Sequence, residues 1–188
     1  MELLPFGKLS PYKTRTLVPV DLALDDWKVI EPFFDELQKR IAACQSVTDL
    51  EAWVLEVSEL SAILDEEGSR RYIAMTCHTS NNEAKKGYLD FVENIEPGMK
   101  KHFFCLSKLF VEHPRRNDLP GERYEVLDRD WASYVELFRE ENVPLETEET
   151  KLGQQYQEMM GALTVEFQGE EKTLVQMGLY LQENDRAL

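Results

Sequence analysis

The sequence predicts a mainly α protein, an antiparallel bundle-like array of long helices with one short β-hairpin near residues 163–173. Three observations lead to this prediction. Apolar residues recur with a period near 3.6 through most of the chain, which is typical of amphipathic helices. Two patterns typical of helix caps precede long periodic segments. One stretch near the carboxy terminus alternates instead, as a half-buried strand does.

Composition is consistent with one domain, or one and a half, that buries a real core. The 188 residues are 43% hydrophobic and 30% charged, and 21 basic residues stand against 36 acidic ones, a net charge of −15. The apolar content is too high for a disordered chain, and no run of about 18 apolar residues predicts a membrane span. Because the negative charge repels phosphate groups, we expect no nucleic acid and no membrane among the partners.

The first 24 residues lack helical periodicity. Pro5, Pro11 and Pro19 interrupt them, and Thr14–Val20 is expected to be extended. We expect an extended arm over 1–24, a helical domain over 25–160, and a hairpin segment over 161–188.

The first helix is expected to start at Glu31–Pro32, because proline is tolerated in a first turn. Its apolar face would consist of Ile30, Phe34, Leu37 and Ile41, with Trp27 just upstream.

Two capping boxes, Thr48–Glu51 and Ser80–Glu83, are expected to open the next two long helices. The first of these helices would extend past Gly68 to Met75. The second would be restarted by Pro97–Gly98 and end at His113–Pro114.

Two further helices follow in the sequence. Periodic apolar residues from Tyr124 to Phe138 indicate the first of them. Asn142–Pro144 is expected to form a short break, and periodic apolar residues from Leu145 to Met159 indicate the second. The acidic residues Glu146, Glu148 and Glu149 would occupy the first turn of this last helix, where the helix dipole favours negative charge.

The hairpin is predicted from alternation. Leu163, Val165 and Phe167 alternate with Thr164 and Glu166. Gln168–Gly169 would form the turn and Glu170–Thr173 the returning strand. One more helix would carry the apolar stripe Leu174, Met177 and Leu181, and Asn184–Asp185 is expected to cap another.

No complete catalytic constellation is apparent in the sequence. The histidines His78, His102 and His113 lack the spacing of a metal site, and HExxH is absent. The cysteines Cys44, Cys77 and Cys105 are expected to be buried structural thiols in a reducing, cytoplasmic setting. We therefore predict no catalytic residue and no metal ligand in this chain.

Clusters of charged residues are expected to lie on solvated faces and at helix ends. The acidic clusters are Asp65–Glu67, Glu140–Glu141, Glu146–Glu149 and Glu170–Glu171. The basic pairs Arg70–Arg71 and Arg115–Arg116 are expected at the surface.

The segment Leu152–Leu174 resembles the region of oligoendopeptidase F-like (thimet oligopeptidase-like) zinc metallopeptidases between their helical amino-terminal region and their catalytic domain. The resemblance lies in Gly161–Ala162, Thr164–Phe167, Gly169–Glu170 and Thr173–Leu174. Further similarity lies in these blocks: Arg15–Thr16 with Pro19 and Trp27, Gly68–Ser69, Arg71–Tyr72, Met75–Thr76, Phe138–Arg139, Glu140–Asn142, Pro144–Leu145 and Asn184–Arg186.

The resemblance implies that this chain is the noncatalytic amino-terminal part of such a peptidase. The zinc site of the family, HExxH and a later glutamate, belongs to a catalytic domain that is absent here. The implied partners are that catalytic domain and a short peptide substrate. The hairpin residues Thr164, Val165, Glu166, Phe167 and Gly169 are candidates for the rim of the substrate cleft, since a strand edge pairs with extended peptides.

Two other hypotheses remain. The first is a free-standing acidic helical module that binds a basic protein partner. The second, with little support, is an independent enzyme that uses Cys77 or the acidic clusters. Under the favoured hypothesis, the apolar stripe Leu174, Met177 and Leu181 would lack its packing partner. We therefore expect the isolated chain to self-associate, or its carboxy-terminal segment to be poorly ordered.

Overall fold

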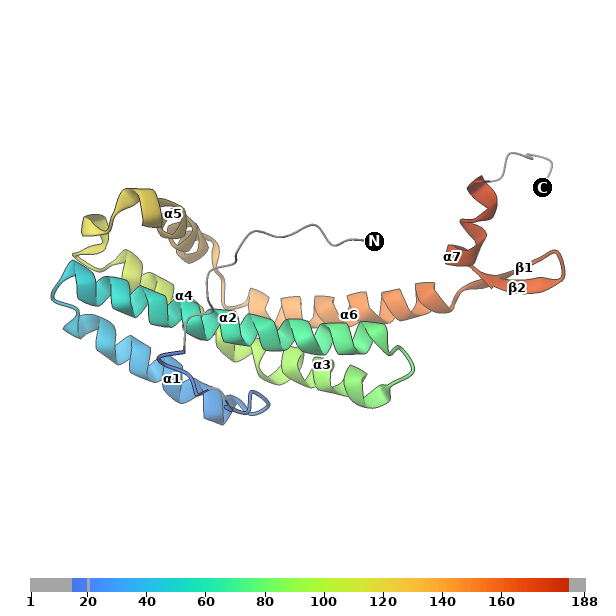
Figure 1. The fold of residues 1–188 in the computed structure, drawn as a ribbon, viewed down its shortest axis with the longest axis horizontal. Helices are drawn as coiled ribbons and strands as arrows, with labels where there is room; N and C mark the ends of the chain where they lie inside the picture. Colours follow the sequence, from blue (N-terminus) through green and yellow to red (C-terminus); the bar gives the residue numbers. More distant parts are fainter. Residues whose placement is uncertain (1–14, 20, 183–188) are drawn as a thin grey trace, which may run out of the picture. The chain divides into compact units, whose positions relative to one another are not determined.

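The computed structural model describes residues 15–19 and 21–182, which are mostly helical and contain one two-stranded sheet. The predicted fold class is therefore confirmed (Figure 1). The chain divides into two compact units, Met1–Glu140 and Glu141–Leu188. The three-part division expected from the sequence stays a prediction, and Pro5, Pro11 and Asn184–Asp185 lie outside the described residues.

Helix α1 spans Trp27–Arg40, so the expected start at Glu31–Pro32 is wrong. Asp26 is the N-cap, and its carboxylate accepts a hydrogen bond from the backbone N–H of Lys28 at 3.0 Å. Because Asp26 already satisfies a first-turn donor, the helix begins at Trp27 and Pro32 lies inside it.

Helix α2 spans Val47–Cys77 and continues past Gly68, as predicted. Its capping box, however, consists of Ser46 and Asp49. The predicted pair Thr48 and Glu51 is wrong, because α2 begins at Val47 and Thr48 therefore lies inside the helix. Glu51 accepts a hydrogen bond from the Tyr124 hydroxyl at 2.6 Å.

Helices α3 (Asn82–Asn94) and α4 (Glu96–Val111) return along α2 (Figure 1). The cap of α3 is Asn81, whose side chain accepts from the N–H groups of Glu83 and Ala84, so the predicted Ser80 cap is wrong. The restart at Pro97–Gly98 is confirmed, because α3 ends at Asn94 and Pro97 lies in the first turn of α4.

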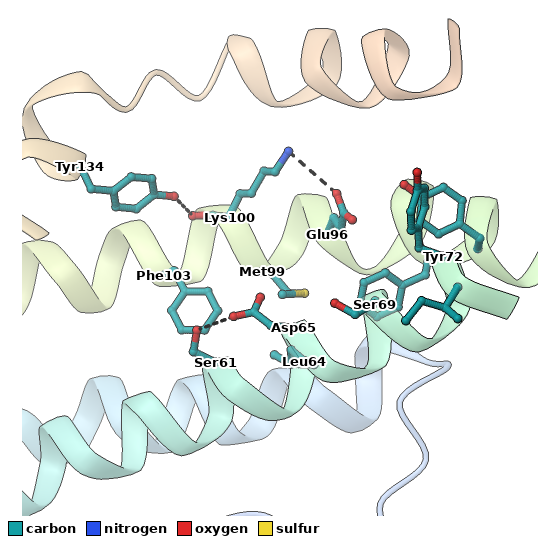
Figure 2. Close-up of a pocket in the computed structure, with 14 residues that line it drawn as sticks. Ser61, Leu64, Asp65, Ser69, Tyr72, Glu96, Met99, Lys100, Phe103 and Tyr134 are labelled. Atoms are coloured by element: carbon teal, nitrogen blue, oxygen red, sulfur yellow. Dashed lines mark hydrogen bonds and ion pairs between the residues drawn. The ribbon is translucent and has the colours of Figure 1, made fainter. Parts of the chain in front are cut away.

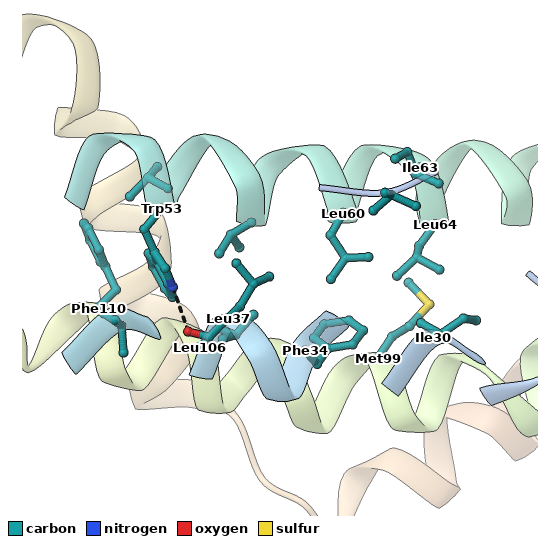
Figure 3. Close-up of a cluster of buried hydrophobic side chains, with 14 of the residues drawn as sticks. Ile30, Phe34, Leu37, Trp53, Leu60, Ile63, Leu64, Met99, Leu106 and Phe110 are labelled. Atoms are coloured by element: carbon teal, nitrogen blue, oxygen red, sulfur yellow. Dashed lines mark hydrogen bonds between the residues drawn. The ribbon is translucent and has the colours of Figure 1, made fainter. Parts of the chain in front are cut away.

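The hydrophobic core lies among α1, α2 and α4, and Figure 3 shows their apolar side chains meeting. The indole N–H of Trp53 donates a 2.8 Å hydrogen bond to the carbonyl of Leu37 inside this core. Gly98 permits a close approach of α4 to α1, since a Cβ there would lie 2.6 Å from the Trp27 ring. Fully buried members include Ile30, Phe34, Leu37, Trp53, Leu60, Leu64, Leu106 and Phe110.

The described part of the amino-terminal arm is held by one side chain on α2. The Glu59 carboxylate accepts hydrogen bonds from the N–H groups of Thr16, Leu17 and Val18 at 2.7–2.9 Å, and from the Thr16 hydroxyl at 2.9 Å. Val18 itself is buried in the core. Residues 16–18 of the arm are therefore part of the helical body.

Two short 3₁₀ turns and helix α5 complete the first unit. The turns are η1 (Ile41–Ala43) and η2 (Arg116–Asp118), and α5 spans Gly121–Leu137. The ring of Trp131 on α5 meets Phe110 edge-on at 4.9 Å. Arg116 pairs with Asp128, which fixes the loop before α5 onto that helix.

In the second unit, helix α6 spans Asn142–Ala162. Asn142–Pro144 is thus its first turn, where a proline costs no hydrogen bond, and the predicted break there is wrong. The break lies at residues 138–141. The placement of Glu146, Glu148 and Glu149 in the first turn is wrong for the same reason.

The predicted hairpin is confirmed. Strands β1 (Thr164–Phe167) and β2 (Glu170–Thr173) pair antiparallel, with Thr164 opposite Thr173 and Phe167 opposite Glu170. Gln168 and Gly169 both have positive φ, 54° and 81°, as a tight hairpin turn requires.

The segment after the hairpin is less regular than expected. Helix α7 covers only Leu174–Met177, capped by Thr173 and Gln176, and a 3₁₀ turn, η3, covers Tyr180–Gln182. The Tyr180 ring packs on Phe167 at 4.7 Å, which ties this segment to the hairpin.

Candidate functional site

The first unit contains a pocket of about 810 Å³ (Figure 2). Helices α2, α3, α4 and α5 all contribute to it. Its lining residues are Ser61, Leu64, Asp65, Gly68, Ser69, Tyr72, Ile73, Tyr88, Phe91, Glu96, Met99, Lys100, Phe103 and Tyr134.

One face of α2 forms half of the wall. Its lining residues follow each other at three- and four-residue spacing, so they share one side of the helix. The small side chains of Ser61 and Ser69 lie on this face beside the larger Tyr72 and Ile73. Gly68 lets the Phe91 ring of α3 approach closely, since a Cβ there would lie 3.0 Å from that ring. The long, regular helix thus fixes the pocket wall in place.

The base of the pocket is apolar. Leu64, Phe91 and Met99 are buried, and Phe103 packs edge-on against Phe34 of the core at 5.0 Å. The pocket is therefore a direct extension of the hydrophobic core, and its shape depends on the packing of α2 against α3 and α4.

Polar groups surround this apolar base. Asp65 accepts a hydrogen bond from Ser61 at 3.3 Å, and Glu96 lies 4.0 Å from the ammonium of Lys100. The Tyr134 hydroxyl donates to the carbonyl of Lys100 at 3.0 Å, which positions α5 at the edge. Figure 2 shows these three contacts around the cavity.

Two tyrosines form an aromatic corner of the pocket. The rings of Tyr72 and Tyr88 meet nearly edge to face at 5.5 Å. Burial raises the pKa of Tyr88, and the negative charge of Glu96 raises it further. Tyr88 therefore stays a neutral hydroxyl at physiological pH, able to donate or accept a hydrogen bond.

The arrangement has the features of a ligand-binding pocket. Among residues 15–19 and 21–182, no group of three or more His, Cys, Asp or Glu side chains could hold a metal ion. Pockets of this size that combine an apolar base with a few polar groups are typical ligand sites.

The three histidines lie apart from one another. His78 follows the end of α2, and His113 accepts a hydrogen bond from the Arg115 N–H at 3.2 Å. His102 packs between the rings of Trp27 and Phe34 at 5.1 and 5.3 Å. Their environments match ordinary surface and core-edge residues.

The expected burial of the cysteines is wrong for two of them. Cys77 and Cys105 are exposed, and Cys44 is half-buried. Cys105 precedes the buried Leu106 on α4, so it projects about 100° away from the core face. Burial raises the pKa of the Cys44 thiol, which makes it less reactive.

Most charged clusters form the exposed pairs expected of a solvated surface. Glu66 pairs with Arg70, Lys101 with Glu140, and Lys151 with Glu148. Glu170 is also exposed, but its partner Lys172 is partly buried.

Arg71 and Arg116 depart from that expectation because both are partly buried. Arg71 pairs with Glu67 at 2.7 Å and donates to the carbonyls of Gly87 and Leu24. It therefore joins α2, α3 and the chain before α1.

The hairpin residues form one exposed element. Thr164, Val165, Glu166 and Phe167 make up β1, and Gly169 lies in its turn. The Thr164 hydroxyl donates to Glu171 at 2.5 Å, which links the two strands. Their role at a substrate cleft stays a prediction.

The pocket was not predicted from the sequence. The signal that could have indicated it is the row of small residues Ser61, Gly68 and Ser69 on a face that also carries Tyr72. Their apposition to Glu96 and Phe103 depends on tertiary packing, which periodicity does not reveal.

None of the helices in the described ranges combines the length and apolarity needed to cross a membrane. No curated protein and no solved structure matches the chain. The family model for the Peptidase M3 N-terminal domain, in contrast, matches residues 20–138. This span contains all five long helices that surround the core and pocket of the first unit. On this match, the chain belongs to the Peptidase M3 N-terminal domain family.

Proposed function

We propose that this chain is the noncatalytic amino-terminal part of a zinc-dependent oligoendopeptidase of the oligoendopeptidase F type, which hydrolyses short peptides. The observation that carries the proposal is the family match over residues 20–138. The resemblance of Leu152–Leu174 to the connection toward a catalytic domain supports it from outside the matched span.

In this proposal the helical body is one wall of a substrate cleft. Peptide hydrolysis needs a polarised water and a stabilised oxyanion, which zinc and a glutamate of the catalytic domain would supply. A rigid helical wall would exclude folded proteins and water from the reaction. The partners are thus the catalytic domain and a short peptide. The three free thiols agree with a reducing compartment such as the cytoplasm.

The decisive experiment begins with the coding region after the codon for Leu188. We expect an HExxH motif downstream in the same reading frame. The complete product, once purified, should cleave a short fluorogenic peptide, lose activity with a chelator, and regain it with zinc. Its matched control carries Glu→Gln within HExxH and should bind zinc without cleaving.

A second step tests the wall. Deleting the helical body from the complete product should allow cleavage of long unfolded polypeptides that the complete product spares. A reading frame without any metallopeptidase motif would contradict the proposal. It would favour the acidic module that binds a basic protein, for which the net charge of −15 is the relevant observation.

A further inference from the structure

We propose that the pocket on α2, α3 and α4 binds the basic side chain of a peptide. Its carboxylates Asp65 and Glu96 would attract the cationic group, and the rings of Tyr72 and Tyr88 would cover it. This inference deepens the proposed function, on which it rests for the statement that peptides are the physiological ligand.

The charge of the lining points to a cation. Two carboxylates stand against one ammonium, that of Lys100, which lies 4.0 Å from Glu96. Asp65 accepts a hydrogen bond from Ser61 at 3.3 Å, and the described residues offer it no cationic partner. An incoming guanidinium or ammonium would therefore supply a charge that Asp65 lacks.

The aromatic corner fits the same ligand. A cation is attracted to the face of a tyrosine ring within about 6 Å of its centre. Tyr72 and Tyr88, with centres 5.5 Å apart and nearly edge to face, present ring surface beside the acidic groups. The apolar base of Leu64, Phe91 and Met99 suits the methylene stem of arginine or lysine, which packs on apolar surface.

The pocket is also accessible from solvent. Asp65 and Tyr72 are exposed, Tyr72 by 41%, whereas Phe91 and Met99 below them are buried. A side chain could enter past Asp65 and place its stem on the apolar base. The peptide backbone would remain outside, as expected for recognition of one side chain within an extended peptide.

The test uses the purified 188-residue chain and two blocked tripeptides, acetyl-Leu-Arg-Leu-amide and the same peptide with citrulline. Citrulline keeps the shape of arginine but removes the charge. Calorimetry should show binding of the arginine peptide that is about tenfold tighter than that of the citrulline peptide. Backbone NMR shifts should concentrate on Asp65, Tyr72 and Tyr88.

Matched variants assign the effect to the pocket. Asp65→Asn should weaken binding of the arginine peptide by about tenfold, and Tyr72→Leu by about threefold. Asp35→Asn makes the same charge change on the exposed face of α1, away from the pocket, and should bind as the unaltered chain does. Asp65 is exposed, so its substitution leaves the fold intact.

Three results would overturn the inference: equal affinities for the two peptides, unaltered binding by Asp65→Asn, or no binding up to about 10 mM peptide. These outcomes are independent of the proposed peptidase, because the assay needs no catalytic domain. Conversely, a reading frame without HExxH would refute the peptidase and leave arginine binding measurable.

Discussion

The helical body and the second unit use their apolar residues in opposite ways. In the body, α1, α2 and α4 bury large side chains such as Phe34, Trp53 and Phe110 completely. In residues 141–182, Val143 is the only buried residue, whereas α6 exposes four large apolar side chains by more than half. These four are Leu145, Leu152, Tyr156 and Met159.

The comparison teaches that similar helical periodicity can have two meanings. In α1, the apolar face faces a core, so it stabilises the fold by burial. On α6, a periodic stripe remains in solvent. A contiguous exposed stripe of this kind is typical of a surface that binds a partner. The following predictions test this difference, beginning with the largest expected effect.

A core truncation in the body should be the most destabilising change. Phe34→Ala removes a ring with 0% exposure, and we expect the free energy of unfolding to fall by about 3–5 kcal/mol. Tyr156→Ala on α6, where the side chain is 58% exposed, should change it by less than about 0.5 kcal/mol. Urea denaturation followed by circular dichroism measures both. If both variants lost a similar amount of unfolding free energy, the contrast between a buried face in α1 and an exposed stripe on α6 would be wrong.

The contact between Glu59 and the arm should come next. Glu59→Gln removes the charge that holds Thr16, Leu17 and Val18, and should destabilise the arm by about 1–2 kcal/mol. Hydrogen exchange of these three amides should accelerate by about tenfold or more. Glu125→Gln, an exposed neutralisation on α5, is the control and should leave the exchange unaltered.

The same contact has a defined pH dependence. Partial burial would raise the pKa of Glu59, but the hydrogen bonds from Val18, Thr16 and Leu17 outweigh it and hold the pKa below its usual 4.5. A carboxyl with a lowered folded-state pKa stabilises the fold fully above its unfolded pKa. The arm should therefore be held at neutral pH and released as the pH falls below about 4.5. Release at a higher pH would contradict this assignment.

In the second unit, replacing a glycine by alanine should destabilise the hairpin turn but not helix α6. Gly169→Ala places a side chain at φ 81° and should destabilise the hairpin by about 1 kcal/mol. Gly153→Ala, inside α6 with open space around it, should instead stabilise that helix by roughly 0.5–1 kcal/mol. Hydrogen exchange across β1, β2 and α6 distinguishes the two effects. Destabilisation by both substitutions would show that α6 is packed more tightly than its exposure indicates.

Replacing exposed apolar residues after the hairpin should change stability very little and self-association clearly. Val175 and Leu181 are 87% and 88% exposed, so Val175→Lys with Leu181→Lys should change the unfolding free energy by less than about 0.5 kcal/mol. We expect the unaltered chain to self-associate and the double variant to do so less, as measured by light scattering. Glu166→Lys, which makes the same change of two charge units at an exposed position of the hairpin, serves as the control.

Much of the body could be predicted from local pattern. The spacing of Ile30, Phe34 and Leu37 predicted the buried face of α1, and Ile41 in the adjoining turn η1 is buried as well. Gly169 and the alternation before it correctly located the hairpin. These features depend on residues close in sequence, which is why a single chain reveals them.

Helix caps and thiol burial were predicted less well, for a physical reason. Several side chains near each helix start can accept the same backbone hydrogen bonds, so Ser46 and Asn81 compete with Thr48 and Ser80. A sequence pattern does not rank these acceptors, and the structure uses Ser46 for α2 and Asn81 for α3. The pocket likewise arises only when residues as distant as Ser61 and Tyr134 meet.

The hydrogen bonds between the arm and Glu59 have a consequence for the folding kinetics of the body. The contact from Thr16 to Glu59 spans 43 residues and encloses the whole of α1. Closing a loop of that length has an entropic cost that local helix contacts do not have, so this contact should form after the transition state for folding. Interactions formed that late mainly slow unfolding. We therefore expect the Glu59 carboxylate to lengthen the lifetime of the native state and to change the folding rate little.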